Sequence, residues 1–143
     1  MAKPILCLDF DGVIHSYSSG WKGARNIPDP PVPGALEFIY EALSANWDVV
    51  IHSSRARYFG GITAMRRWLK DWADNPNSVP WYEDGIGGTG LEFVRFTRWK
   101  PSALITIDDR ALTFDGHWPT LKSLKEFKPW NKREIPKDAA KQP

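Results

Sequence analysis

Four short apolar runs alternate with two amphipathic stretches over the first 110 residues of this 143-residue chain. Each run is rich in large apolar residues, as expected of strands that a parallel sheet buries on both faces. The four runs are residues 5–10, 47–52, 91–96 and 103–107. The pattern therefore predicts four strands before residue 110.

Two amphipathic helices are predicted between these strands. Apolar residues recur at i, i+3, i+4 and i+7 from Leu36 to Leu43, and a second apolar face extends from Ile62 to Trp72. Strands that alternate with helices predict an α/β fold with right-handed crossovers. We expect a Rossmann-like, doubly wound and mostly parallel sheet.

Length and composition predict one domain followed by a tail. A short fifth strand is predicted to begin at Phe114, and a last helix is predicted over residues 121–127. The domain should therefore span residues 1–128, and the polar residues 129–143 should form a loosely held tail. From Lys125 onward the chain carries six basic and three acidic residues, so the local charge is +3.

The N-terminal apolar stretch and the single cysteine limit where in the cell the protein is expected. Asp9 interrupts the stretch after four residues, which is too short for a signal sequence or a membrane span. Cys7 has no second cysteine with which to form an internal disulfide. We therefore expect a soluble cytoplasmic protein without a membrane partner, and the oligomeric state is left open.

Two acidic pairs follow two of the predicted strands. Asp9 and Asp11 end the first strand, and Asp108 and Asp109 follow the fourth. Ligands of such sheets bind beyond the carboxyl ends of the strands, near the point where the strand order reverses. Four carboxylates gathered there would repel one another unless a divalent cation compensated their charge. The pattern therefore predicts a magnesium site and chemistry on phosphate.

Two further polar residues complete an ordered set. Ser53 follows the second strand, and Lys100 precedes the fourth. Either residue alone has an ordinary interpretation, a helix cap for Ser53 and a solvated surface charge for Lys100. The order of all the motifs, however, resembles the haloacid dehalogenase-like (HAD) phosphohydrolase superfamily. Residues 9–13 match its first motif, Ser53 its second, Lys100 its third, and the acidic pair 108–109 its fourth.

The resemblance implies a HAD-like fold and a magnesium-dependent phosphatase. Asp9 would be the nucleophile that forms an aspartyl-phosphate, and Asp11 would protonate the leaving oxygen and then deprotonate the attacking water. Magnesium would be held by Asp9, the Asp11 carbonyl and Asp108, with Asp109 supporting these ligands. The phosphoryl oxygens would be bound by Ser53 and Lys100.

Two features narrow the range of predicted substrates. Members of the superfamily select substrates largely with inserted caps, and neither insertion point has room for a large cap domain, so a capless enzyme with an open cleft is implied. Residues 53–55 and 108–110 also form Ser-x-Arg and Asp-Asp-Arg patterns similar to those of the 3′-phosphatase module of phage polynucleotide kinase. Arg55 would then fork a phosphate, and the basic tail would follow a nucleic-acid backbone.

A nucleotide or a nucleic-acid 3′-phosphate end is therefore one predicted substrate class. A small-metabolite phosphatase of the same superfamily is the alternative. Two readings without turnover also remain, a non-catalytic phosphate-binding domain and a receiver-like signalling domain. A receiver domain would carry its phospho-acceptor aspartate on a middle strand, and no aspartate ends the middle strands predicted here.

The remaining features suggest no separate activity. Residues 85–90 satisfy a Gly-x-Gly-x-x-Gly pattern, but no predicted strand precedes them and no helix follows, so a loop is expected. His15 could reach substrate from its loop, whereas His52 is expected to be a core residue, and neither is assigned a role. Trp21 and Trp81 fall in loops that could flank the site.

Overall fold

The computed structural model describes residues 2–75 and 90–134. The chain divides into two compact units, Met1–Asp108 and Asp109–Pro143, and each is described by itself. The predicted boundary of the catalytic domain at residue 128 stays a prediction. The glycine-rich residues 85–89 and Trp81 lie outside the described residues, as does most of the predicted tail.

The first unit is built on a four-stranded sheet whose pairings are all parallel. The strands are β1 (Ile5–Leu8), β2 (Asp48–His52), β3 (Arg95–Thr97) and β4 (Ile105–Ile107). Their order across the sheet is β3-β2-β1-β4. The chain therefore moves outward from β1 through β2 to β3 and then returns to the other side of β1. The strand order reverses between β1 and β4.

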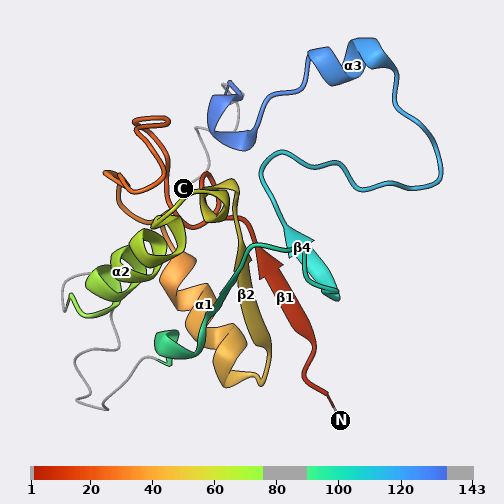
Figure 1. Ribbon diagram of the computed structural model, residues 1–143. Helices are drawn as coiled ribbons and strands as arrows, with labels where there is room; N and C mark the ends of the chain where they lie inside the picture. Colours follow the sequence, from red (N-terminus) through yellow and green to blue (C-terminus); the bar gives the residue numbers. More distant parts are fainter. Residues whose placement is uncertain (1, 76–89, 135–143) are drawn as a thin grey trace, which may run out of the picture. The chain divides into compact units, whose positions relative to one another are not determined.

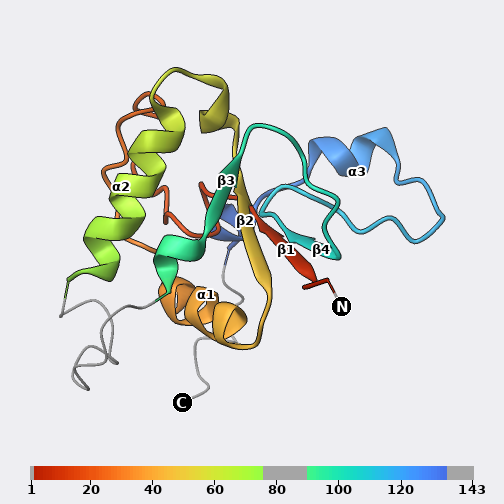
Figure 2. The same ribbon diagram turned by 60° about the horizontal axis from the view of Figure 1, so that its bottom comes forward.

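Helices α1 (Ala35–Ser44) and α2 (Gly61–Ala73) pack on one face of this sheet (Figures 1 and 2). Leu6 and Leu8 of β1 and Val49 and Ile51 of β2 point to that face, because alternate residues of a strand share a side. They form one buried cluster with the helix residues Leu36, Ile39, Met65, Trp68 and Leu69. The predicted helix faces and the mostly parallel α/β class are thereby confirmed.

The predicted strand over residues 91–96 is half wrong. Leu91–Phe93 form a 3₁₀ turn, and strand β3 begins only at Arg95. Leu91 and Val94 are buried, whereas the two residues between them are exposed. A spacing of three places both apolar side chains on one side of a 3₁₀ turn, where residues i and i+3 eclipse. The apolar run thus follows a period of three at this point, and not the period of two of a strand.

The second unit lacks the predicted fifth strand among residues 109–134, and helix α3 (Leu121–Lys125) is shorter than predicted. The backbone N–H of His117 donates a hydrogen bond to Asp115 Oδ1, and Gly116 has a φ of 97°. These two features make a turn where the strand was expected. Thr120 caps α3 by accepting a hydrogen bond from the N–H of Ser123.

Candidate functional site

Asp9 and Asp108 meet at the carboxyl ends of the adjacent strands β1 and β4. Leu8 and Ile107 are register partners, so the residues that follow them leave the sheet side by side. The N–H of Asp9 donates to the carbonyl of Ile107 over 2.9 Å, which extends the ladder by one residue. This edge is where the strand order reverses, the position at which open parallel sheets bind ligands.

Three carboxylates gather at this edge. Asp9, Asp108 and Asp109 each offer one oxygen, and these oxygens lie within 4.8 Å of one another. Oδ1 of Asp109 is buried and accepts no hydrogen bond from a described residue. A buried carboxylate oxygen without a donor is costly, and three adjacent negative charges repel one another. A cation would relieve both costs, so the cluster could bind a metal ion.

Asp11 takes its carboxylate away from this cluster into a buried network. Arg55 Nε donates to both of its oxygens, at 3.0 Å to Oδ1 and 2.9 Å to Oδ2. His15 Nδ1 lies 2.8 Å from Oδ1. The side chain of Asp11 is therefore not among the carboxylates gathered with Asp9, and the predicted metal ligand from Asp11, its carbonyl, stays a prediction.

A tight turn after β1 brings His15 to Asp11. The carbonyl of Phe10 accepts hydrogen bonds from Val13, Ile14 and His15, and Gly12 adopts a left-handed φ of 82° that favours glycine. The His15 ring is fully buried. Its Nε2 accepts a hydrogen bond from the N–H of Asp29, which places the ring proton on Nδ1, and that proton points to Asp11.

Asp29 anchors the far end of this network. The N–H and the hydroxyl of Ser19 both donate to its carboxylate, and these hydrogen bonds hold the pKa of Asp29 below its usual value. The carbonyl of Asp29 accepts from Trp68 Nε1 on α2. The loop after β1 is thereby fastened both to the first motif and to the helix layer.

Arg55, which the resemblance implies as a phosphate ligand, is fully buried. Its Nε holds Asp11, and its Nη1 donates to three carbonyl oxygens of the loop after β1. The three acceptors are Gly23, Ala24 and Asn26. Only Nη2 is buried without a partner among the described residues. Binding of phosphate by Arg55 stays a prediction, and it is confined to that one nitrogen.

Ser53 and Lys100 approach the site from two other connections. Ser53 caps the 3₁₀ turn η1 (Ser54–Arg57), and its Oγ accepts from the N–H of Arg55. Lys100 is exposed between β3 and β4. Burial raises the pKa of the Cys7 thiol; Asp9 and Asp108 raise it further, and Lys100 lowers it. The lysine and both aspartates therefore lie within electrostatic range of one thiol in β1.

The sequence alone did not assign roles to His15, Asp29 or Trp21. His15 stands four residues after Asp11, a spacing that means contact only if the intervening residues form a helix-like turn. No periodic pattern in the sequence predicted that turn. The ring of Trp21 lies over the guanidinium of Arg55, with 4.8 Å from Cζ to the ring centroid. Trp21 therefore does flank the network, as its loop position suggested.

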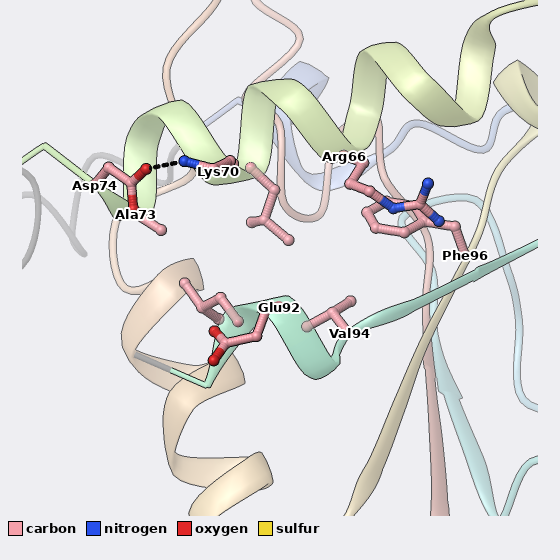
Figure 3. A pocket seen from close by; sticks show the side chains of 9 residues that line it. Arg66, Lys70, Ala73, Asp74, Glu92, Val94 and Phe96 are labelled. Atoms are coloured by element: carbon pink, nitrogen blue, oxygen red, sulfur yellow. Dashed lines mark hydrogen bonds and ion pairs between the residues drawn. The ribbon is translucent and has the colours of Figure 1, made fainter. Parts of the chain in front are cut away.

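A separate pocket of about 370 Å³ lies between α2 and residues 91–96 (Figure 3). Arg66 lies over the ring of Phe96, and Lys70 pairs with Asp74 at its margin. None of the predicted site residues lines it. The carboxylate cluster and this pocket are therefore different places on the molecule.

Comparison of the chain with protein-family models, with curated proteins and with solved structures gave no significant match. Within residues 2–75 and 90–134, no helix combines the length and the apolar character needed to cross a membrane. The class that the fold and the site define is thus an α/β protein with a carboxylate cluster at the switch point of its sheet.

Proposed function

We propose that this protein is a magnesium-dependent phosphomonoester hydrolase that works through an aspartyl-phosphate. The observation that carries the proposal is the meeting of Asp9, Asp108 and Asp109 where the strand order reverses. The ordered motifs that resemble the HAD phosphohydrolases support it, and they imply a HAD-like fold. Carboxylate oxygens are the ligands that Mg²⁺ prefers.

Asp9 is the nucleophile in this proposal. Its carboxylate is oriented because the N–H of Phe10 donates to Oδ1 over 2.8 Å. A carboxylate oxygen of Asp9 forms a bond to phosphorus while the bond from phosphorus to the leaving oxygen breaks. Water then attacks the phosphorus of the aspartyl-phosphate, which releases phosphate and restores Asp9.

Asp11 transfers the protons. It gives one to the leaving oxygen in the first step and takes one from the attacking water in the second. Oδ1 is engaged by both His15 and Arg55, whereas among the described residues Oδ2 is engaged by Arg55 alone. Oδ2 is therefore the oxygen we assign to proton exchange. The buried donors hold the Asp11 carboxylate in one orientation. A fixed orientation favours proton transfer in both steps of the reaction.

In this proposal, magnesium and the phosphoryl group are bound by different residues. Asp9, Asp108 and Asp109 would hold magnesium, and the unpartnered Oδ1 of Asp109 fits this role. Bound magnesium would neutralise negative charge on the phosphoryl group. Ser53 accepts a hydrogen bond at Oγ but keeps its own hydroxyl proton to donate, and Lys100 supplies positive charge.

The test is magnesium-dependent hydrolysis of a generic aryl phosphate. Asp9→Asn should abolish turnover, because an amide is a poor nucleophile and a poor magnesium ligand. Asp74→Asn is the matched control, since Asp74 pairs only with Lys70 on the exposed side of α2 among the interactions described. It should retain full turnover.

Two outcomes would contradict the proposal at different points. Unchanged turnover in a folded Asp9→Asn variant would remove the assignment of the nucleophile. Failure of the wild-type protein to hydrolyse any member of a broad phosphoester panel with magnesium would remove the function itself. A small-metabolite phosphatase would share every chemical step and differ only in which member of the panel is preferred.

A further inference from the structure

Two half-exposed aromatic rings lie together beside the Asp11 network. Trp21 is 46% exposed and Tyr58 is 53% exposed, and their ring centroids are 5.9 Å apart with an angle of 49° between the planes. Trp21 comes from the loop after β1, and Tyr58 directly follows η1 after β2. Figure 1 shows both connections leaving the same end of the two central strands. Paired aromatic surface left open to solvent favours a binding role.

The guanidinium of Arg55 connects the ring pair to Asp11, the proposed acid–base residue. The Cζ atom of Arg55 lies 4.8 Å from the centroid of the Trp21 ring, while Nε of the same group binds Asp11. The positive charge under the inner side of Trp21 stabilises the position of this ring through a cation–π contact. A flat group stacked on the pair would therefore lie close to the reacting phosphate.

The loops that carry the two rings are held against each other. Arg55 Nη1 binds three carbonyls that follow Trp21, and the N–H of Tyr58 donates to the Arg55 carbonyl. A Cβ added at Gly61 would come 1.9 Å from that carbonyl oxygen, and one added at Gly60 would come 2.8 Å from the Arg25 side chain. At position 61 only glycine permits this approach to the backbone, and at position 60 the left-handed φ of 78° favours glycine. Binding to rings already held in place costs little ordering entropy.

The stretches of these two loops that carry the rings are rich in positive charge. Residues 17–26 and 54–60 contain four basic residues and no Asp or Glu. Three of these, Lys22, Arg25 and Arg57, are exposed, and the fourth is the buried Arg55. A cluster of one sign attracts ligands of the other sign. The surface thus offers stacking and positive charge together.

We propose that Trp21 and Tyr58 form a stacking platform for the nucleobase of a phosphorylated nucleotide. The inference rests on the proposed phosphatase function and names its substrate class. Aromatic side chains beside cations bind nucleobases without strong sequence preference, because every base has a π-face. If Trp21 served only to cover the Arg55 guanidinium, its position would be explained. The half-exposed ring of Tyr58 beside it would not be explained.

The experiment compares ligands that differ only in the base. One pair is a nucleoside 5′-monophosphate and ribose 5-phosphate, and the second is a short 3′-phosphorylated oligonucleotide with a normal or an abasic final residue. Both direct binding and kcat/KM are measured for the wild type. The base should improve binding roughly tenfold or more, the range of one stacking contact.

Tyr58→Ala should remove most of this gain and leave the base-free ligands unchanged. Tyr58→Phe should restore it, because the ring and not the hydroxyl is required. Phe93→Ala is the matched control, an aromatic residue 70% exposed that precedes β3 at the amino end of the sheet. This variant should behave as wild type. Trp21→Ala is secondary, since loss of the ring also uncovers Arg55.

Each outcome decides the proposal. A base-dependent gain in either pair that Tyr58→Ala removes supports the platform, and the pair that shows the gain identifies a free nucleotide or a nucleic-acid end as its source. Equal binding within both pairs, or a gain that survives in Tyr58→Ala, overturns it. Because binding is measured apart from turnover, absence of hydrolysis would refute the proposed function, and the binding comparison would still decide the platform.

Discussion

The buried guanidinium of Arg55 organises the candidate site. Arg55 is fully buried, and its charge is compensated by Asp11 and by three loop carbonyls. Burying a charge without partners is expensive, so the contact between Arg55 and Asp11 has a structural role besides any catalytic one. The first and second motifs are thereby fixed to each other through their side chains.

Asp11→Asn should reveal both roles. Turnover should fall roughly 10²–10⁴-fold, the usual contribution of a general acid–base group. The neutral amide also leaves Arg55 without its counter-ion, and breaking a buried pair costs about 3–5 kcal/mol. The measurements are kcat below the melting temperature and the free energy of unfolding in denaturant. A variant that lost activity but kept full stability would show that the ion pair contributes nothing to the fold.

Local pattern predicted the elements wherever side-chain burial followed a regular period. The apolar faces of α1 and α2 and the buried residues of β1 and β2 were predicted to within a few residues. Strand β4 was placed as closely, although its three residues are exposed and not buried as the apolar run suggested. The two errors in strand assignment, at Leu91–Phe93 and at Phe114, lie beside the left-handed glycines Gly90 and Gly116. Short apolar runs do not distinguish a strand from a 3₁₀ turn until the packing partner is known.

The first residue of β2 and the first residue of β3 form an ion pair. Arg95 donates from Nε and Nη2 to the Asp48 carboxylate, and this contact lowers the pKa of Asp48. Because the folded-state pKa is the lower one, the stabilisation is present above the unfolded pKa of about 3.9 and is lost as pH falls through the folded value.

Asp48→Asn should therefore destabilise the protein at pH 6, and the difference should shrink as the pH falls from about 3.9 through the lower folded-state pKa. The cost at pH 6 should be at most about 1 kcal/mol, since the pair is partly exposed to solvent. The free energy of unfolding of the wild type and the variant, measured across this range, checks the prediction. A difference that did not shrink on acidification would contradict it.

For the whole molecule, metal binding should stabilise the fold. A cation that binds only the native state raises the free energy of unfolding by mass action, by about 2.7 kcal/mol at one hundred times Kd. Magnesium should therefore raise Tm in the wild type and much less in Asp108→Ala, which lacks one carboxylate of the cluster. Thermal unfolding with and without magnesium is the measurement. No shift in the wild type, or an equal shift in Asp108→Ala, would contradict the site.

Hydrophobic periodicity and strand order are local and topological properties, and they were enough to predict the α/β class and an acid, a hydroxyl and a second acid at strand ends. From the strand ends alone, all four carboxylates were expected together. In the folded chain, Asp109 joins Asp9 and Asp108, while Asp11 turns to Arg55 and His15. The reason is physical: a buried guanidinium needs a counter-ion, and the loop geometry that supplies it arises from contacts between residues far apart in the chain.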